Sequence, residues 1–397
     1  MRSRILLLAA VLLCGPLGMT SARGPQRLFA YEPGKCALTI TEVFEAMFKT
    51  EVGLLIGARA RLSQSHLLHY DLYTPLNPQK RQFLRAGDLG MLRKSHFNPE
   101  WPVRISIHGW SGRSESCSNA AIKDAYLSRG NYNVIILDWS RQAMDISYQR
   151  VSTQLSSIAA NVAKMLRFLH DSTGVPYEQI YLVGHSAGSH ISGLAGKHLR
   201  PQLLGAIIAL DPAGLTQLSL GPEDRLSPHD AMYVESIHTD LTLLGNPSDL
   251  LSHASFFVNW GLGQPHCPNA TAAEFAFVCD HFAALYYFAE SIRRPRLFPA
   301  LRCDSGAAIH SATCHCRNST SSNSTSSNST SSSIHAMRQT CHGDQFMGGE
   351  PAVQKNGVYY LSTRRQAPYG HIDGMVHMKP PVKSNVFETG GPRFWPQ

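Results

Sequence analysis

Beyond its first residues, the sequence contains no apolar run long enough to cross a membrane, which takes about 20 consecutive apolar residues. At the N-terminus, Met1–Arg4 supplies positive charge and Ile5–Leu13 is apolar. That run is too short for a membrane helix, and the small residues of Thr20–Ala22 fit a cleavage site. We therefore expect a signal peptide at residues 1–22 and a secreted, soluble mature protein.

Dense basic clusters are also lacking. The formal net charge is +8, but Lys and Arg are scattered along the chain, and the densest group is Arg293–Arg296. A nucleic-acid partner is therefore not expected. Attraction to anionic lipid surfaces or sulfated glycans would suit a secreted chain, and an ordinary solvated surface is the simpler explanation of the charge.

The usual spacing of a zinc site is missing too. Cys314-His315-Cys316 does not match it, and export disfavours free thiolates. Of the nine cysteines, Cys14 lies in the leader, and eight remain: Cys36, Cys117, Cys267, Cys279, Cys303, Cys314, Cys316 and Cys341. An even set in a secreted chain indicates four disulfides, although eight cysteines allow 105 pairings.

Among the features present, Gly184-His185-Ser186-Ala187-Gly188 is the most informative. It follows the apolar run Ile180–Val183, which predicts a strand, and precedes the small residues of Ser189–Gly196, which predict a helix. A serine at such a turn is a nucleophile elbow, where glycines let strand and helix approach closely. The motif arises by chance in roughly one chain in ten of this length, so its position between strand and helix carries the prediction.

A nucleophilic serine needs a base and a group that orients the base, and on this architecture Asp or Glu and then His follow the serine. Asp211 ends the apolar run Leu203–Leu210, although Asp-Pro is also a common strand-ending turn. His281 lies downstream beside a cysteine and precedes the amphipathic segment Phe282–Ser291. Its place in the chain after Ser186 and Asp211, close to a cysteine, singles it out among 19 histidines. We predict a triad of Ser186, Asp211 and His281.

Four segments of the chain resemble the secreted pancreatic-lipase superfamily, particularly its insect phospholipase A(1)-like members. They are Val183–Gly188, which contains the elbow, Leu210–Gly214, Ile237–Asp240 and Cys279–His281. The resemblance extends from about His69 to Pro368. It implies an enzyme that cleaves lipid carboxylic esters through an acyl-enzyme on the serine.

The resemblance also implies an oxyanion hole. Trp101–Trp110 contains the His-Gly-aromatic loop of the family, so the backbone N–H groups of Trp110 and Ala187 would hold the oxyanion. Trp110 also fits an ordinary core aromatic after a strand. The family usually has Leu after the nucleophile, and Ala187 keeps the N–H donor while it reshapes the acyl pocket.

Resemblance and proximity together suggest the disulfide pairs Cys267–Cys279, Cys303–Cys314 and Cys316–Cys341, which leaves Cys36 with Cys117. Some relatives bind a structural calcium ion near the equivalent of Glu223–Asp230. Ser227 stands where the family has an Asp ligand, so a hard cation would lose a charged oxygen there. We therefore predict no metal and no cofactor.

The elements alternate as an α/β fold requires. The pattern predicts a helix over Val151–His170, and strands at residues 69–73, 103–107, 134–138, 233–237, 255–259 and 358–362. We expect an α/β-hydrolase fold, with a central, mostly parallel sheet flanked by helices. Residues 363–397 are too few for the C-terminal β-sandwich domain of the pancreatic enzymes, so no protein cofactor of the kind that docks there is expected.

Residues 23–368 are expected to form one catalytic domain, followed by a C-terminal tail at residues 369–397. Within the domain, residues 317–333 form a Ser/Thr/Asn-rich insert with glycosylation sequons at Asn318, Asn323 and Asn328, and another sequon lies at Asn269. The repeats offer no apolar face, so we expect an exposed, glycan-bearing loop.

The two loops that would roof the site are short. Only residues 268–278 separate Cys267 from Cys279, and the second roof segment, Leu241–Ser252, is also abbreviated, as in the phospholipase members. A long lid offers apolar area to a third acyl chain, whereas a short one leaves room for a hydrated head group. We favour a phospholipase A(1) that cleaves the sn-1 ester at a membrane or lipoprotein surface. The alternatives are a triacylglycerol or galactolipid lipase, and a catalytically silent lipid-binding or yolk-storage relative.

Overall fold

In the computed structural model, the described residues are 27–31, 36–39, 68–145, 147–214, 220–267, 276–316 and 340–380. Only the backbone is described for the first two ranges and for Ala276. The expected signal peptide, the Ser/Thr/Asn-rich insert and all four sequons lie outside these residues. Among the helices that are described, none is long and apolar enough to span a membrane.

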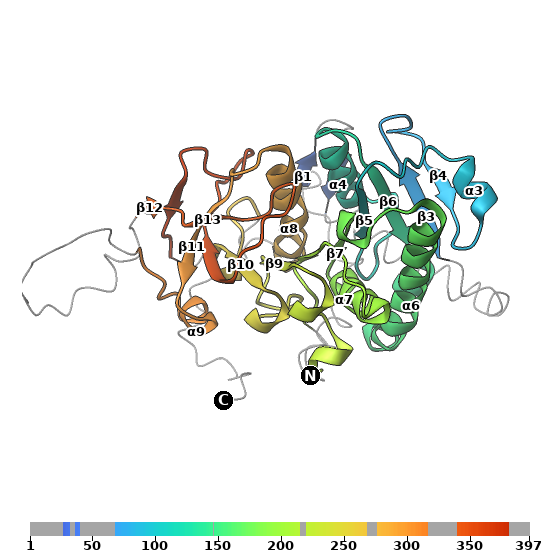
Figure 1. Ribbon diagram of the computed structural model, residues 1–397. Helices are drawn as coiled ribbons and strands as arrows, with labels where there is room; N and C mark the ends of the chain where they lie inside the picture. The colour runs from blue at the N-terminus through green and yellow to red at the C-terminus, as the bar shows by residue number, and fades with distance from the viewer. Residues whose placement is uncertain are drawn as a thin grey trace, which may run out of the picture.

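An 11-stranded sheet forms the centre of the molecule (Figure 1). In spatial order its strands are β13 (Gln345–Phe346), β11 (Pro299–Cys303), β14 (Gly357–Leu361), β10 (Ala254–Val258), β9 (Val234–His238), β8 (Ala206–Leu210), β7 (Ile180–His185), β5 (Val103–Ile107), β6 (Asn133–Asp138), β3 (His69–Tyr73) and β4 (Gln82–Leu84). The strands from β14 to β6 are parallel, and the strands at both edges are antiparallel. Helices flank this mostly parallel sheet, which confirms the predicted α/β-hydrolase fold.

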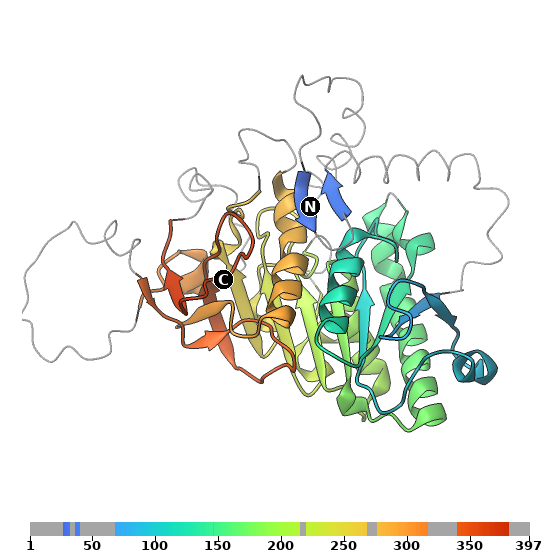
Figure 2. The same ribbon diagram turned by 90° about the horizontal axis from the view of Figure 1, so that it is seen from above.

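Helices cover both faces of the sheet (Figures 1 and 2). One face carries α6 (Tyr148–Thr173) and α7 (Ala187–Leu199), and the other carries α4 (Cys117–Leu127) and α8 (Ala276–Arg293). The described residues also form shorter helices and two two-stranded sheets, among them α3 (Leu89–Arg93), α5 (Ser140–Ala143), α9 (Gly306–His310), β1 (Arg27–Tyr31) with β2 (Cys36–Thr39), and β12 (Thr340–His342) with β15 (Met375–His377).

The central strands bury both of their faces, which explains their continuous apolar sequences. In β8, Ile207 packs into the core beneath α6 and α7, while the next residue, Ile208, packs into the core beneath α4 and α8. Successive side chains of a strand point to opposite faces. Residues of β8 are therefore apolar without alternation.

Helices α6 and α8 both begin earlier than the sequence pattern predicts. Helix α6 begins at Tyr148, after Ser147 caps it by accepting a hydrogen bond from a backbone N–H, and ends at Gly174 in the left-handed region (φ 76°). Helix α8 begins before His281, because Val278 and Cys279 are buried and extend its inner face. His281 therefore lies inside a helix.

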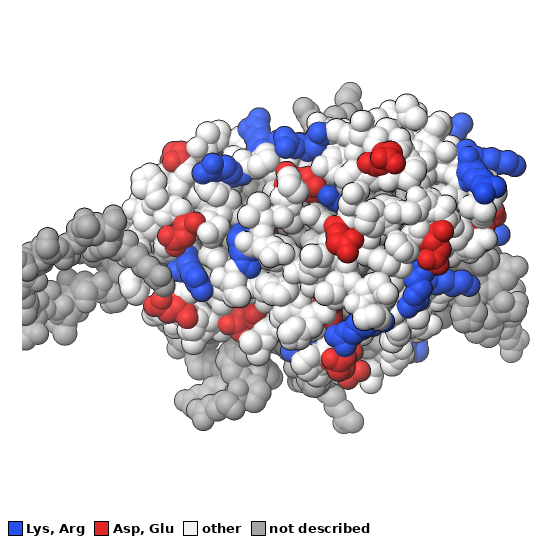
Figure 3. Space-filling model, in the orientation of Figure 1, with Lys and Arg blue, Asp and Glu red and all other residues white. Residues whose placement is uncertain are grey.

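The surface carries charges of both signs. Figure 3 shows Lys and Arg interspersed with Asp and Glu over the visible face. This distribution agrees with the scatter of basic residues along the sequence.

Three disulfides join cysteines of the described residues in the pairs expected by resemblance, Cys267–Cys279, Cys303–Cys314 and Cys316–Cys341. Cys117 is disulfide-bonded as well, and the side chain of Cys36, its expected partner, lies outside the described residues.

Candidate active site

Ser186 lies on a sharp turn between β7 and α7. Its backbone has φ 55° and ψ −122°, an unusual conformation for a residue with a side chain, and its N–H donates to Leu210 O of the neighbouring strand over 3.0 Å. The adjoining glycines are required sterically. A Cβ on Gly184 would lie 2.4 Å from Gly188 O, and one on Gly188 would lie 2.2 Å from Ile107 O. The turn therefore has the geometry of a nucleophile elbow.

Asp211 and His281 are in direct contact. Asp211 follows β8, and its Oδ2 lies 2.5 Å from His281 Nδ1. The other carboxylate oxygen accepts hydrogen bonds from the N–H groups of Thr239 (2.7 Å) and Asp240 (3.0 Å). Because the carboxylate lies against Nδ1, that atom carries the proton and Nε2 keeps its lone pair. Complete burial raises the pKa of the Asp211 carboxyl, and the hydrogen bond from His281 acts in the opposite direction.

His185 connects the end of β7 to the helix that carries His281. Its Nε2 donates to His281 O over 3.1 Å, and the two rings lie 4.7 Å apart. Burial, and then the proximity of His281, lowers the pKa of His185 well below its usual value, so its ring is neutral. Among the described residues, no hydrogen bond joins the Ser186 hydroxyl to the His281 ring. Hydrogen bonds of this kind are often long in the absence of substrate.

The loop that contains Gly109 lies directly against Ser186. A Cβ on Gly109 would lie 2.7 Å from Ser186 Cβ and 3.3 Å from Ser186 Oγ. His108 fixes the loop, because its ring stacks on Trp139 at 5.3 Å and its carbonyl oxygen accepts from Trp139 Nε1 over 2.8 Å. Only a residue without a side chain fits between this loop and the serine.

The expected oxyanion donors are the backbone N–H groups of Trp110 and Ala187. No described protein group accepts the N–H of Trp110, whose side-chain Nε1 donates to Asp145 O over 2.7 Å. Ala187 is the first residue of α7, where an N–H has no intrahelical acceptor. Both donors are thus available to an oxygen atom.

Gln264 links the surroundings of Asp211 to those of His281. Its side-chain amide donates to Thr239 O (2.9 Å), and its backbone N–H donates to the carboxylate of Asp280 (2.7 Å). Sequence reasoning missed Gln264 and gave Thr239 no role, although it used the segment around Thr239 in the resemblance. A polar residue in a loop carries no local sign of what it contacts, so only the fold shows this role.

Three clusters within the described residues have donor atoms that could hold a metal. In the first, Asp211, Asp240 and His281, the His281 Nδ1 already contacts a carboxylate. In the second, around His266, both cysteine sulfurs belong to the Cys267–Cys279 disulfide. The third is His371, Asp373 and His377, where Arg364 and Lys379 add positive charge beside His371.

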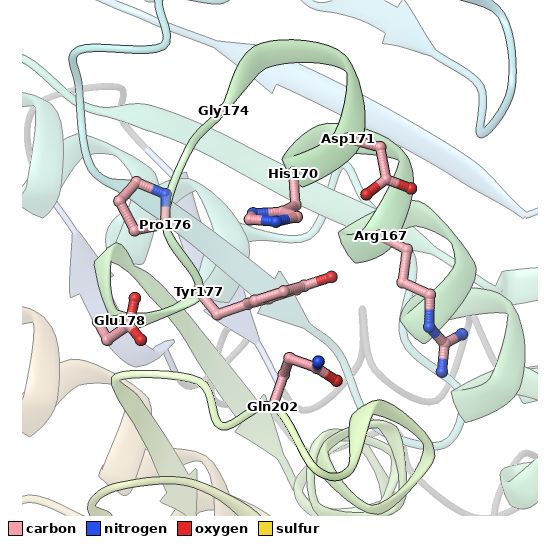
Figure 4. Close-up of a pocket in the computed structure, with 8 residues that line it drawn as sticks. All are labelled: Arg167, His170, Asp171, Gly174, Pro176, Tyr177, Glu178 and Gln202. Atoms are coloured by element: carbon pink, nitrogen blue, oxygen red, sulfur yellow. The ribbon is translucent and has the colours of Figure 1, made fainter.

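A hollow of about 510 Å³ lies at the other end of β7 from Ser186 (Figure 4). His170 and Tyr177 stack in it with ring centroids 4.4 Å apart. Arg167, Asp171, Glu178 and Gln202 add charged and polar groups to its wall. None of the predicted site residues lines this hollow.

Comparison with known proteins gives consistent matches. A family model described as Lipase matches residues 54–369. Lipase member H of Danio rerio is 32% identical over 246 residues, which cover 61% of this chain and 53% of the relative. Pancreatic triacylglycerol lipase of Cavia porcellus is 31% identical over 265 residues (61% and 55%), and phospholipase A1 member A of Bos taurus is 32% identical over 235 residues (58% and 50%). The chain spans about half the length of the curated relatives it matches.

Proposed function

This chain belongs to the lipase family, and from that premise we propose that it hydrolyses lipid carboxylic esters through an acyl-enzyme on Ser186. The observation that carries the proposal is the 2.5 Å contact between Asp211 Oδ2 and His281 Nδ1, beside a serine on a strand-to-helix turn. In these roles, Ser186 is the nucleophile, His281 is first base and then acid, and Asp211 orients His281.

The reaction follows from these positions. Ser186 Oγ attacks the ester carbonyl carbon while His281 Nε2 takes the serine proton. The N–H groups of Trp110 and Ala187 hold the oxyanion, each stabilising the transition state by about 3 kcal/mol. His281 then gives the proton to the departing alcohol, which leaves an acyl-enzyme, and water releases the fatty acid by the reverse sequence.

Asp211 keeps the imidazole in the required tautomer. Its carboxylate is fully buried and accepts two backbone N–H groups on one oxygen, so the other oxygen is directed at His281 Nδ1. When His281 takes the serine proton, the positive charge develops beside this carboxylate. The attraction is strong because water is excluded from both groups.

A fluorophosphonate probe tests the mechanism without assuming a substrate. The probe should label the purified protein, and peptide mapping should locate the label on Ser186. His281→Gln should label much more slowly, because it removes the base, whereas His315→Gln, an exposed histidine, should label at the wild-type rate. A protein that binds lipid vesicles but takes no label would instead be a catalytically silent relative.

Within this class we propose a phospholipase A(1) that cleaves the sn-1 ester. The support is the short connection between Cys267 and Cys279, a sequence separation of 12, which leaves little apolar roof for a third acyl chain. The names of the relatives include both a triacylglycerol lipase and a phospholipase, so names alone do not choose between substrates.

The substrate proposal is tested by comparing sn-1-labelled phosphatidylcholine or phosphatidylserine with trioleoylglycerol at the same interface. We expect faster release of the sn-1 label from the phospholipid. Preference for trioleoylglycerol, or lysolipid that retains the sn-1 label, would overturn the substrate assignment and leave the mechanism standing. Galactolipid in the same panel tests the remaining hydrolase alternative.

We also propose that the protein is secreted. Its disulfides fit an oxidising compartment, and residues 1–22 have the pattern of a signal peptide. N-terminal sequencing of protein recovered from the medium of expressing cells should begin at Arg23 or within a residue or two of it. Retention of Met1 in secreted protein would contradict cleavage.

A further inference from the structure

Lys197, in the last turn of α7, directs its ammonium group at three oxygen atoms of one loop. Its Nζ lies 2.9 Å from Arg225 O and 3.1 Å from Ser227 Oγ, and it forms an ion pair with Asp230 Oδ1. The Lys197 side chain is 9% exposed and that of Asp230 is 0% exposed. An ammonium group has three N–H donors, and each of them has one acceptor here.

Two glycines of α7 bring the loop this close to the helix. A Cβ on Gly193 would lie 2.6 Å from Asp230 Oδ2, and one on Gly196 would lie 2.1 Å from Asp230 O. The loop closes on itself as well, because Ser227 N and Ser227 Oγ donate to the Asp230 carboxylate over 2.8 and 2.9 Å. The loop backbone therefore lies directly on the helix, with Lys197 filling the space that the oxygens surround.

The fold family implies a calcium ion at this loop, and the residues present do not fit one. Calcium takes six to eight oxygen ligands with several carboxylates among them. Among the described residues, Asp230 supplies the one buried carboxylate that faces this space, whereas Glu223 is 72% exposed and pairs with Arg200. Arg200 also lies 3.6 Å from Asp230 Oδ1. A doubly charged ion would have to share the space with the Lys197 ammonium group.

We propose that the Lys197 ammonium group replaces the calcium ion as the cation that holds residues 222–230 on α7. The chain then carries its own cation, and this loop needs no metal.

The loop is tied to the candidate active site through His190. Its Nδ1 accepts from Leu226 N over 3.3 Å, and its Nε2 donates to Ala213 O over 2.8 Å, two residues after Asp211. A loop held by Lys197 therefore supports the segment that carries Asp211, whatever the calcium concentration.

Thermal unfolding of the whole mature chain, in chelator and in millimolar calcium, tests the proposal independently of any enzymatic activity. Wild type should unfold at the same temperature in both. Lys197→Ala should unfold at least roughly 5 °C lower in both, because it leaves the Asp230 carboxylate buried without its partner. Lys164→Ala, an exposed lysine on α6, is the control and should leave the midpoint unchanged.

A double variant, Lys197→Ala with Ser227→Asp, supplies the missing carboxylate in place of the ammonium group. Its midpoint should be low in chelator and rise saturably with calcium, whereas Ser227→Asp alone should not respond because Lys197 still fills the space. A wild-type midpoint that rises with calcium, a Lys197→Ala midpoint equal to wild type, or a double variant indifferent to calcium would each overturn the proposal. The wild-type measurement decides the question even if a variant fails to fold.

Discussion

The side-chain amide of Gln264 donates a 2.9 Å hydrogen bond to the carbonyl oxygen of Thr239, the residue whose N–H in turn donates to Asp211. The backbone N–H of the same glutamine donates to Asp280, which precedes His281. One buried residue thus fixes the loop that orients the carboxylate and the helix that carries the imidazole. Gln264 therefore supports the direct contact between Asp211 and His281.

Gln264→Met should lower kcat roughly tenfold with little change in KM, because it keeps about the length of the side chain and removes the amide donor without burying a charge. The measurement is a steady-state ester hydrolysis assay. Gln202→Met, at an exposed position remote from the site, is the matched control and should behave as wild type. A rise in KM at constant kcat would show that Gln264 serves binding and not the position of the triad.

Gly109→Ala should lower kcat by about a hundredfold, since its Cβ would lie 2.7 Å from Ser186 Cβ and would displace the serine or the loop that contains Gly109. Gly90→Ala is the control, because a Cβ there meets only Asp88 Oδ1, at 3.5 Å. Circular dichroism should show both variants folded. Wild-type kcat in Gly109→Ala would contradict the packing of this loop against the nucleophile.

The elbow could be predicted from the sequence because its determinants are local. The apolar residues before Gly184 and the small residues after Gly188 specify a strand and a helix that meet at Ser186, as the structure shows. Chain order then indicated Asp211 and His281, which the structure brings into contact.

The remaining contacts could not be predicted, because they join segments that are distant in sequence. Lys197 meets Arg225 O, a backbone atom that any residue would supply, and no periodic pattern marks the pair. The edge strand β13 has only two residues, and the antiparallel strand β11 beside it exposes Arg302, so neither has the continuous apolar run of a buried parallel strand. Such features depend on tertiary packing and become visible only in the fold.

Glu350→Gln should lower the free energy of unfolding by about 3–5 kcal/mol, because it leaves Arg104 buried without its counter-charge. Arg104 Nη2 lies 2.6 Å from Glu350 Oε1, and both side chains are under 5% exposed (4% and 3%). The control is Glu115→Gln in the exposed pair with Arg81, which should cost less than about 1 kcal/mol. Urea unfolding measures both, and equal effects would contradict the assignment of Arg104–Glu350 as a buried pair.

The free energy of unfolding should fall as the pH falls from about 6.5 towards 4, because two histidines are buried in their neutral form. Burial lowers the pKa of His190 from 6.5 to about 4 and that of His266 to about 4 in the folded state. In this interval the unfolded chain binds protons that the folded chain does not, so protonation favours unfolding. Above the pKa of histidine in the unfolded chain, neither state binds the proton, and this loss of stability is absent.

Urea unfolding as a function of pH measures this effect, and a variant isolates one histidine. His190→Gln should reduce the slope of stability against pH between 4 and 6.5 relative to wild type. His198→Gln, on the same helix, serves as the matched control. An unchanged slope in His190→Gln would show that His190 is not buried in its neutral form.

Hydrolysis through Ser186 is tested most directly by comparing Ser186→Ala with Ser192→Ala in an assay with a water-soluble ester. Both serines lie at or in α7 and are nearly buried, at 8% and 0% exposed. With both variants shown to be folded, Ser186→Ala should lose about a millionfold in turnover, and Ser192→Ala should keep activity near that of wild type. Full activity in Ser186→Ala would contradict catalysis by this serine.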